Sequence, residues 1–471
     1  MKFDVAIIGS GFAGSILAWI LASRGRKVAL IDAAIHPRFA IGESSTPIAD
    51  KLLMRLGQHY DLPELVQLST YGGWQQHHGE IACGKKRGFS YFFHDRGEPF
   101  SDAADHDRSL LVAASAGDNV ADTHWYRSEM DAYLFSKAIQ CCAVDFTGRR
   151  VVGVRVAEYE SELNRVVLAD HDPIEASYLI DASGRASVLA ALTGAADLSS
   201  TLSTNTRSVF AHYRDVKSWS AKRGEPSDPF DADDAAQHHL VGNAWMWMLR
   251  FNNGVTSVGL TGKDIAGRSL LPNDYPGLMD LFREAEFVAP ENGPLQTGRL
   301  QRLFDPVVGS RCWMLPTSAV TIDPLHSTGI AHALAGVDRS AQMILDGCSR
   351  SDVKYYGQRV TNESRFLDQL VSIAYESMND FSRFTTACML YFAAAIACEE
   401  RYQAGETPSQ LFSADDDGFA NAIDDLQSAF ASGTPTAALT QQARQKLAPW
   451  NGAGLLDPSV KNRYAYTATK A

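Results

Sequence analysis

The first residues of this chain, DVAIIGSGFAG (residues 4–14), decide its fold. Asp4–Ile8 is a continuous apolar run, which is typical of a strand buried on both faces, and Ser15–Ser23 has the pattern of a helix. Lys27–Asp32 (KVALID) predicts a second buried strand. A strand, a helix and a strand in this order indicate a parallel sheet, because parallel strands need a crossover connection.

The glycines between the first strand and the helix form a G-x-G-x-x-G turn. Gly9 permits a tight turn, Gly11 lets the backbone approach a pyrophosphate, and Gly14 lets the helix pack close to the strand. The helix N-terminus offers unpaired N–H groups to phosphates. Asp32, at the end of the second strand, can accept ribose hydroxyls and would repel a 2′-phosphate. We therefore predict a dinucleotide site, with a purely structural glycine turn as the alternative.

Three later groups of residues favour FAD over NAD, a choice that the glycine turn alone does not make. Each is a polar or glycine-containing segment, far from the glycine turn in the sequence, that could contact the rest of a long cofactor. An NAD enzyme does not need such additional contacts. These groups are His36–Arg38 together with Gly42–Ser44, then Asp181–Gly184, and then Ile322–Pro324 together with Ser327–Gly329.

The composition is that of an ordinary globular protein. Of 471 residues, 45 % are hydrophobic, and 43 basic against 55 acidic residues give a net charge of −12. The length allows roughly two to three domains of about 150 residues. The acidic charge argues against nucleic acid and against anionic lipid as partners, because both need a basic footprint.

Cysteine usage and hydropathy predict a cytoplasmic chain without a membrane span. The seven cysteines form no C-x-x-C pair, so we expect free thiols and no metal site. Phe3–Leu21 is apolar but contains the glycine turn, so we interpret it as strand, turn and helix and not as a signal peptide. Phe384–Cys398 is too short to span a membrane, which takes about 20 residues. It predicts a buried helix, with a membrane-surface or partner-facing helix as the alternative.

The pattern changes along the chain and predicts an α/β protein in three parts. Residues 1–350 form an FAD-binding domain interleaved with a β-rich substrate domain, at about residues 75–110 and 186–305. Lys217–His239 is polar and is interpreted as a surface excursion, and residues 351–471 form a C-terminal helical region with a polar linker around Ser432–Thr436. Strands are expected at Gly88–Phe93, Val151–Val156, Arg165–Ala169, Ser177–Ile180, Ser208–Tyr213 and Trp245–Phe251.

Several further motifs accompany the glycine turn. They are His36–Phe39 (HPRF), Ile41–Glu43 with Thr46-Pro47, Cys83-Gly84-x-Lys86-x-Gly88-Phe89-Ser90, Trp245-x-Trp247, Asp323-Pro324-Leu325-x-Ser327-x-Gly329 and Ser377–Phe381. With these motifs the chain resembles the flavin-dependent halogenases, which share a Rossmann-type FAD domain with the hydroxybenzoate hydroxylases. It is most similar to the branch that acts on free phenols. Two family motifs are imperfect: Leu249-Arg250 stands where the family has Ile-Pro, and Thr321 stands where it has Phe.

The resemblance implies roles for particular residues. In the family, reduced FAD, oxygen and chloride or bromide give hypohalous acid, which moves to a lysine beside the substrate. Lys86 holds the position of that lysine, although by pattern alone Lys85 and Lys86 are exposed strand charges. Thr328 and Gly329 match the halide site. Phe89, Trp245 and Trp247 match the substrate pocket, where the paired tryptophans are held to obstruct ordinary monooxygenation; strand aromatics in a core are the alternative for the tryptophans. The cofactor-binding residues would be Gly9, Gly11, Phe12, Ala13, Gly14, Asp32, Arg38, Gly42, Glu43, Ser44, Arg127, Asp181, Asp323, Gly329 and Ile330.

His326 bears on the substrate. Tryptophan-specific relatives carry a glutamate at this position, so its absence favours a phenol, whose hydroxyl already activates the ring. A histidine with an ordinary pKa of about 6.5 could act as a base near neutral pH. It could equally be a neutral residue that packs against the flavin wall.

The partners expected are a small aromatic substrate and a separate flavin reductase, because the chain has one dinucleotide turn and no second one for NAD(P)H. The oligomeric state is left open, with a homodimer as one option. Two other functions stay open: a flavin hydroxylase or geranylgeranyl-reductase-like enzyme, and a flavoprotein that has lost catalysis.

Overall fold

A computed structural model describes residues 1–159, 161–226 and 228–465. Its first sheet has the strand order β18-β19-β10-β1-β2-β7, with β9 and β8 continuing from β10. The central strand β1 (Lys2–Ile8) pairs in parallel with β2 (Val28–Asp32) and with β10 (His171–Asp181), and β10 pairs in parallel with β19 (Cys312–Met314). The predicted parallel sheet is confirmed. The other strands are β7 (Val144–Thr147), β8 (Val151–Arg155), β9 (Asn164–Leu168) and β18 (Val307–Gly309).

Helix α1 (Phe12–Ser23) begins three residues before the predicted start. The glycine turn explains this difference, because Gly11 is already the N-cap and Gly14 lies inside the first helical turn. Helices α5 (Arg127–Gln140) and α10 (Gly329–Asp346) pack on α1. The parallel strands β1, β2, β10 and β19 end at one edge of the sheet, so the segments that follow them are brought together there.

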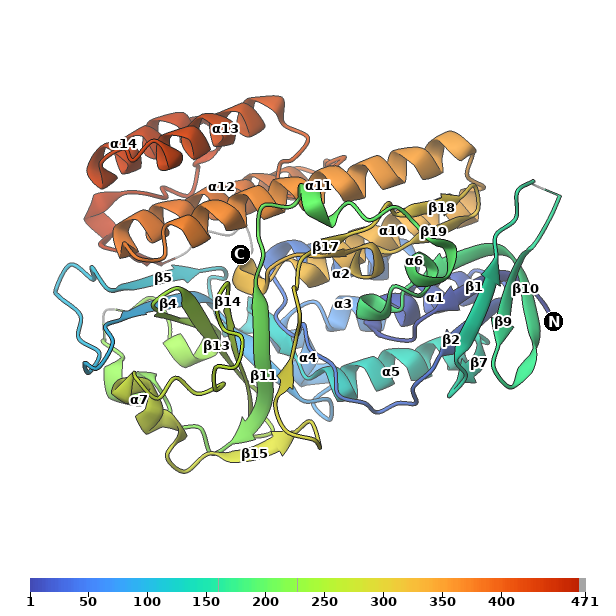
Figure 1. Ribbon diagram of the computed structural model, residues 1–471, viewed down its shortest axis with the longest axis horizontal. Helices are drawn as coiled ribbons and strands as arrows, with labels where there is room; N and C mark the ends of the chain where they lie inside the picture. Colours follow the sequence, from blue (N-terminus) through green and yellow to red (C-terminus); the bar gives the residue numbers. More distant parts are fainter. Residues whose placement is uncertain (160, 227, 466–471) are drawn as a thin grey trace.

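The second sheet occupies the opposite end of the molecule (Figure 1). Its order is β15-β11-β14-β13-β12-β4-β5-β21, with β16 paired to β11. Alternate residues of β13 lie in separate cores: Trp245 and Trp247 face the flavin-domain side, whereas Met246 and Met248 face away. The strands are β4 (Gly88–His94), β5 (Ser109–Ala113), β11 (Arg207–Arg214), β12 (Ala235–Val241), β13 (Ala244–Arg250), β14 (Val255–Gly262), β15 (Glu286–Ala289), β16 (Leu295–Gln296) and β21 (Arg463–Tyr464).

The interpretation of Lys217–His239 as a surface excursion is wrong for its last residues. Strand β12 begins at Ala235, and all its residues are buried in the middle of the sheet. Its polar side chains are paired with one another: His239 bonds His94 at 2.9 Å and Gln237 at 3.0 Å. Because buried polar groups are tolerated when they are hydrogen-bonded, a strand with few β-branched residues forms here. The other expected strands are present within a few residues of their predicted ends.

The C-terminal region is helical, as predicted, and its helices lie over both sheets (Figure 1). They are α11 (Arg350–Glu376), α12 (Phe381–Gln403), α13 (Asp417–Ala431) and α14 (Thr436–Lys446). Helix α12 is long and apolar enough to cross a membrane by length and composition, but 89 % of its apolar window is buried inside the protein. The predicted buried helix is therefore present. One short strand, β21, departs from the helical pattern and pairs with β5.

Short elements connect these layers. They are α2 (Pro47–His59), α3 (Pro63–Gln67), α4 (Tyr71–His77), α6 (Val188–Thr193), α7 (Ser220–Arg223), α8 (Pro276–Met279), α9 (Pro316–Ala319), β3 (Cys83–Lys86), β6 (Asp122–Trp125), β17 (Arg302–Leu303) and β20 (Val320–Thr321). Strands β3 and β6 pair with each other outside the two large sheets.

Candidate active site

A cavity of about 280 Å³ lies between the first sheet's helices and the inner face of the second sheet; we name it the main cavity. Its walls include the start of α1, the loop after β2, the start of α5, strands β11, β12 and β13, and the segment that leads into α10. Nine of the predicted site residues line it, namely Phe12, Gly42, Glu43, Ser44, Arg127, Asp323, Thr328, Gly329 and Ile330, as do both tryptophans of β13.

The glycine turn has the geometry that a pyrophosphate requires. A Cβ atom on Gly9, whose φ is +108°, would lie 2.2 Å from the carbonyl oxygen of Ala182, and one on Gly14 would lie 1.9 Å from that of Gly9. On Gly11 it would meet only side-chain atoms at 3.6 Å or beyond. No side chain caps the N-terminus of α1, so its first N–H groups are available to an anion. The turn fits FAD, and Ala13 is buried behind it.

Asp32 is held next to this turn. Its carboxylate accepts hydrogen bonds from the Ser10 N–H at 2.8 Å and the Ala34 N–H at 2.9 Å, and it forms an ion pair with Arg38 at 2.8 Å. Burial opposes ionisation, but the Ala34 N–H and the Arg38 guanidinium outweigh burial and hold the pKa of Asp32 below its usual range. The side chain therefore stays an anion at neutral pH.

Asp181 is placed differently from the prediction that it contacts the cofactor. It is fully buried outside the main cavity, and its carboxylate accepts hydrogen bonds from the N–H groups of Ser183 and Leu189. Burial raises its pKa. In this structure Asp181 shapes the loop that crosses over Gly9, and direct contact with FAD stays a prediction.

Arg127 holds one wall of the main cavity in place through hydrogen bonds. It forms two bonds with Asp131, at 2.7 and 2.8 Å, and donates to the carbonyl oxygens of Ile41 and Gly42 at 3.0 and 2.9 Å. Its guanidinium also lies 4.6 Å from the centre of the Phe12 ring. The i, i+4 spacing of Arg127 and Asp131 was a signal in the sequence that pointed to this pair.

Asp323 joins the main cavity to the C-terminal helices. Its carboxylate accepts hydrogen bonds from the hydroxyls of Thr206 at 2.5 Å and Tyr375 at 2.9 Å, and Tyr375 in turn accepts one from the indole N–H of Trp245 at 2.8 Å. Burial raises the pKa of Asp323 to about 6. Sequence analysis missed Tyr375, because it lies in α11, far along the chain from the other members of this network.

The start of α10 faces the main cavity where the halide site was predicted. Thr328 is the N-cap, its side chain accepts no hydrogen bond from the helix N–H groups, and a Cβ atom on Gly329 would meet nothing within 4 Å. His332, which sequence analysis also missed, lines the cavity one turn later. Its Nε2 lies 3.1 Å from a carboxylate oxygen of Glu363, which is fully buried and paired with Arg339.

Lys86 is buried, contrary to the exposed position that its strand pattern indicates. Its Nζ donates to the carbonyl oxygen of Ser45 at 2.5 Å and lies 4.0 Å from the centre of the Phe89 ring. Its neighbour Lys85 pairs at the surface with Asp118 and Asp234, at 2.7 and 2.9 Å.

Two histidines flank Lys86. Burial, with the charge of Lys86 added, lowers the pKa of His124 to about 3, and burial with the same charge does so for His238. Both rings are therefore neutral at physiological pH. His238 also lines the main cavity, so one residue interacts with both Lys86 and that space.

Phe89 lines a second space, of about 20 Å³, that we name the inner cavity. It is bounded by β4 and β5 on one side and by α12 on another. Its lining residues are Pro47, Phe89, Val112, Ala113, Ala114, Tyr391, Phe392, Ala395, Ile396 and Glu399. Phe89 lines the inner cavity and not the main cavity, whereas Lys86 lines neither of them and contacts Phe89. The structure therefore does not bring all the predicted site residues into one space.

His326 is fully buried and stacks on Tyr391, with ring centres 4.2 Å apart and planes 5° from parallel. Burial lowers its pKa to about 3. Such a ring is neutral and a weak base, which fits the packing alternative better than the base role. The base role stays a prediction that this environment does not favour.

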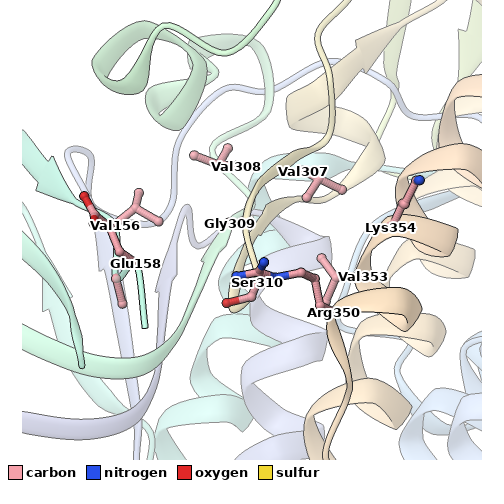
Figure 2. A pocket seen from close by; sticks show the side chains of 10 residues that line it. Val156, Glu158, Val307, Val308, Gly309, Ser310, Arg350, Val353 and Lys354 are labelled. Atoms are coloured by element: carbon pink, nitrogen blue, oxygen red, sulfur yellow. The ribbon is translucent and has the colours of Figure 1, made fainter. Parts of the chain in front are cut away.

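A surface cleft larger than the main cavity is not the site. It has a volume of about 640 Å³ and lies between β8, β18 and the first turn of α11, with Val156, Val307 and Val353 at its base (Figure 2). None of the predicted site residues lines it. Within the described ranges, no cluster of three His, Cys, Asp or Glu side chains is arranged to hold a metal ion.

Comparison with known proteins agrees with this geometry. The family model described as FAD dependent oxidoreductase matches residues 4–337. The tetracycline 7-halogenase of Kitasatospora aureofaciens is 28 % identical, over 90 % of this chain and 78 % of its own length. The monodechloroaminopyrrolnitrin halogenase PrnC of Pseudomonas fluorescens is 26 % identical, over 80 % of this chain and 69 % of its own. The resemblance to flavin-dependent halogenases is therefore confirmed.

Solved structures agree on the fold. The structure of halogenase PltM in complex with phloroglucinol and FAD superposes with a TM-score of 0.88 at 24 % identity, covering 99 % of this chain and 100 % of that one. The brominase Bmp2 superposes less closely, with a TM-score of 0.60 at 16 % identity, covering 95 % of this chain and 100 % of that one. The predicted fold class, a Rossmann-type FAD domain with a β-rich domain and a helical region, is confirmed.

Proposed function

Because the chain belongs to the family of FAD-dependent oxidoreductases, we propose that it is a halogenase that uses reduced FAD to chlorinate or brominate an electron-rich aromatic molecule, most directly a phenol. Family membership confirms the predicted cofactor, FAD. The observation that carries the proposal is the burial of Lys86 between two cavities. Lys86 contacts Ser45, which follows Ser44 of the main cavity, and Phe89, which lines the inner cavity.

The division into two cavities supports a reaction in two places. The glycine turn and the residues of the main cavity would hold FAD, whose reduced form would supply hypohalous acid from oxygen and halide. Overall, the aromatic C–H, halide, oxygen, reduced FAD and one proton give the aromatic C–halogen, oxidised FAD and two water molecules. Lys86 would hold the electrophilic halogen at its Nζ and present it to a ring in the inner cavity. An ordinary hydroxylase has no use for a buried lysine at this place.

Residues of the main cavity would hold the flavin and halide. The first N–H groups of α1 would bind the pyrophosphate, and those of α10, at Thr328 and Gly329, would bind the halide. Trp245 and Trp247 line the main cavity and would keep the aromatic substrate away from the flavin. Their positions are fixed by Tyr375, which bonds Trp245, and by Ser257, whose hydroxyl accepts the Trp247 indole N–H at 3.2 Å.

Two features support the substrate and partner proposals. The inner cavity is lined mostly by apolar and aromatic side chains, which suit a small aromatic molecule. The chain has a single glycine-rich dinucleotide turn, so a separate reductase would supply reduced FAD. A phenol is favoured over free tryptophan because no glutamate stands at position 326.

A product-mass assay tests this function. The protein with FAD, an unrelated flavin reductase and NADH would be given phloroglucinol or tryptophan, in bromide, in chloride or without halide. We expect a halogenated phenol that requires the halide, and unchanged tryptophan. A hydroxylated product, or rapid NADPH oxidation by the protein alone when the aromatic is added, would favour the hydroxylase alternative. Bromotryptophan as the main product would overturn the substrate class.

A further inference from the structure

Glu399 brings a carboxylate into the wall of the inner cavity. Its side chain is 2 % exposed and directly follows the apolar run of α12. It shares a helix face with Phe392, Ala395 and Ile396, because residues three, four and seven apart lie on the same side of a helix. Among the described residues that line this cavity, Glu399 is the one whose side chain ionises to a carboxylate, and Tyr391 is the other with a polar group.

Tyr391 keeps its proton beside this carboxylate. Burial raises the pKa of its hydroxyl well above the usual value, and the charge of Glu399 acts in the same direction. A ligand in the inner cavity therefore meets apolar and aromatic surface together with a carboxylate at one end. Small-molecule pockets commonly have this form, with a few polar groups that fix the orientation of an otherwise apolar ligand.

We infer that Glu399 is a specificity-determining residue whose carboxylate accepts a hydrogen bond from a ring hydroxyl of the substrate. This inference rests on the proposed function and deepens it. Phe89 comes from β4 and touches Lys86, whereas Glu399 comes from α12, so a ring between these elements would have its hydroxyl at the carboxylate and a ring edge toward Lys86. A hydroxyl hydrogen-bonded to a carboxylate also donates more electron density to its ring, which favours attack on an electrophilic halogen.

The inner cavity is large enough for a hydroxyl group, but it is too small for an aromatic ring unless its wall moves. At about 20 Å³ it holds about one water molecule, which is the size of a hydroxyl oxygen. The ring needs side chains of the wall to shift on binding. An aromatic without a hydroxyl offers the carboxylate no hydrogen-bond donor, so it gains nothing from Glu399.

Glu399→Gln tests the inference, with Glu400→Gln as the matched control. Glu400 is the next residue of the same helix, and it is exposed. Each protein would be assayed with phloroglucinol and with 1,3,5-trimethoxybenzene, whose ring is activated by oxygen but has no O–H. We expect Glu399→Gln to lower kcat/KM for phloroglucinol roughly ten- to a hundred-fold, the size of a lost hydrogen bond to a charged group, and to change the methyl ether less than about threefold.

Calorimetric binding of phloroglucinol to the FAD-loaded protein gives a readout that does not depend on halogenation. If the wild type binds phloroglucinol but halogenates nothing, the proposed function fails, and the affinities of the two variants still decide the role of Glu399. Glu399→Asp, which keeps the charge, should fall between the wild type and Glu399→Gln, and melting temperatures would show that each variant is folded. Equal losses for both aromatics, or Glu399→Gln behaving like Glu400→Gln, would overturn the inference.

Discussion

Replacing Gly11 with alanine should weaken FAD binding while the protein stays folded, whereas the same change at Gly14 should destabilise the fold itself. At Gly11 the backbone, with φ −65° and ψ 177°, suits alanine, and the new Cβ would lie 3.6 Å from Asp131 and 3.8 Å from Arg127, which are ordinary contacts. The free energy of unfolding should change by about 0.5 kcal/mol or less. At Gly14 the Cβ would overlap the Gly9 carbonyl oxygen at 1.9 Å, so the turn must shift at a cost of about 1–3 kcal/mol or more.

The effect of Gly11→Ala on the cofactor follows from the same position. The methyl group would stand where the pyrophosphate approaches the first N–H groups of α1. One lost hydrogen bond to a charged phosphate is worth about 1.5–3 kcal/mol, which corresponds to roughly ten- to a hundred-fold weaker binding of FAD.

Two measurements on FAD-free protein separate these effects: thermal unfolding, and flavin fluorescence during titration with FAD. Gly117→Ala is the matched control, because a Cβ atom there meets nothing within 4 Å. If Gly11→Ala binds FAD as tightly as the control, the backbone of the turn does not approach the pyrophosphate. If Gly14→Ala has the same melting temperature as the control, α1 does not pack as closely on the end of β1 as the structure indicates.

Two further predictions concern pH. Burial raises the pKa of Asp323 to about 6 from 3.8, so the folded protein holds this proton more tightly, and stability from this group is lost as the pH rises from about 4 through 6. In urea unfolding of FAD-free protein, the free energy of unfolding of Asp323→Asn relative to that of the wild type should rise by on the order of 3 kcal/mol between pH 4 and pH 7. A difference that does not change with pH would contradict the raised pKa. Burial lowers the pKa of His326 to about 3, so the wild type loses stability as the pH falls below about 6.5. His326→Phe should lose less stability than the wild type as the pH falls, and it should retain FAD binding and phenol bromination. Loss of bromination with FAD still bound would instead support the base role.

The parts of the site that depend on local backbone geometry were predictable from the sequence. The spacing of the glycines and the strand and helix on either side identify the turn, and Asp32 stands at the end of the next strand. The contact of Gly9 with Ala182 depends on a distant part of the chain. The structure differs only in the start of α1, where the turn and the helix overlap.

The parts that depend on packing between distant elements were not predictable in this way. A four-residue strand such as β3 does not reveal which of two lysines is buried, and Lys86 is covered by Ser45 of the segment before α2, by Phe89 of β4 and by His124 of β6. Tyr375 and Glu399 come from helices more than 200 residues beyond the glycine turn, and their periodicity indicates only buried helices. Strand β12 was missed because its histidines and glutamine look solvent-exposed until their partners are known.

The central claim is that Lys86 delivers the halogen, and one comparison tests it most directly. Lys86→Met and Lys85→Met would be supplied with FAD, a flavin reductase, bromide and phloroglucinol, and the bromophenol would be measured by mass spectrometry together with oxygen consumption. We predict that Lys86→Met binds FAD and consumes oxygen but forms no bromophenol, while Lys85→Met, altered at a surface ion pair, forms it nearly as the wild type does. Near-normal bromination by Lys86→Met, or loss of bromination in Lys85→Met alone, would contradict the account.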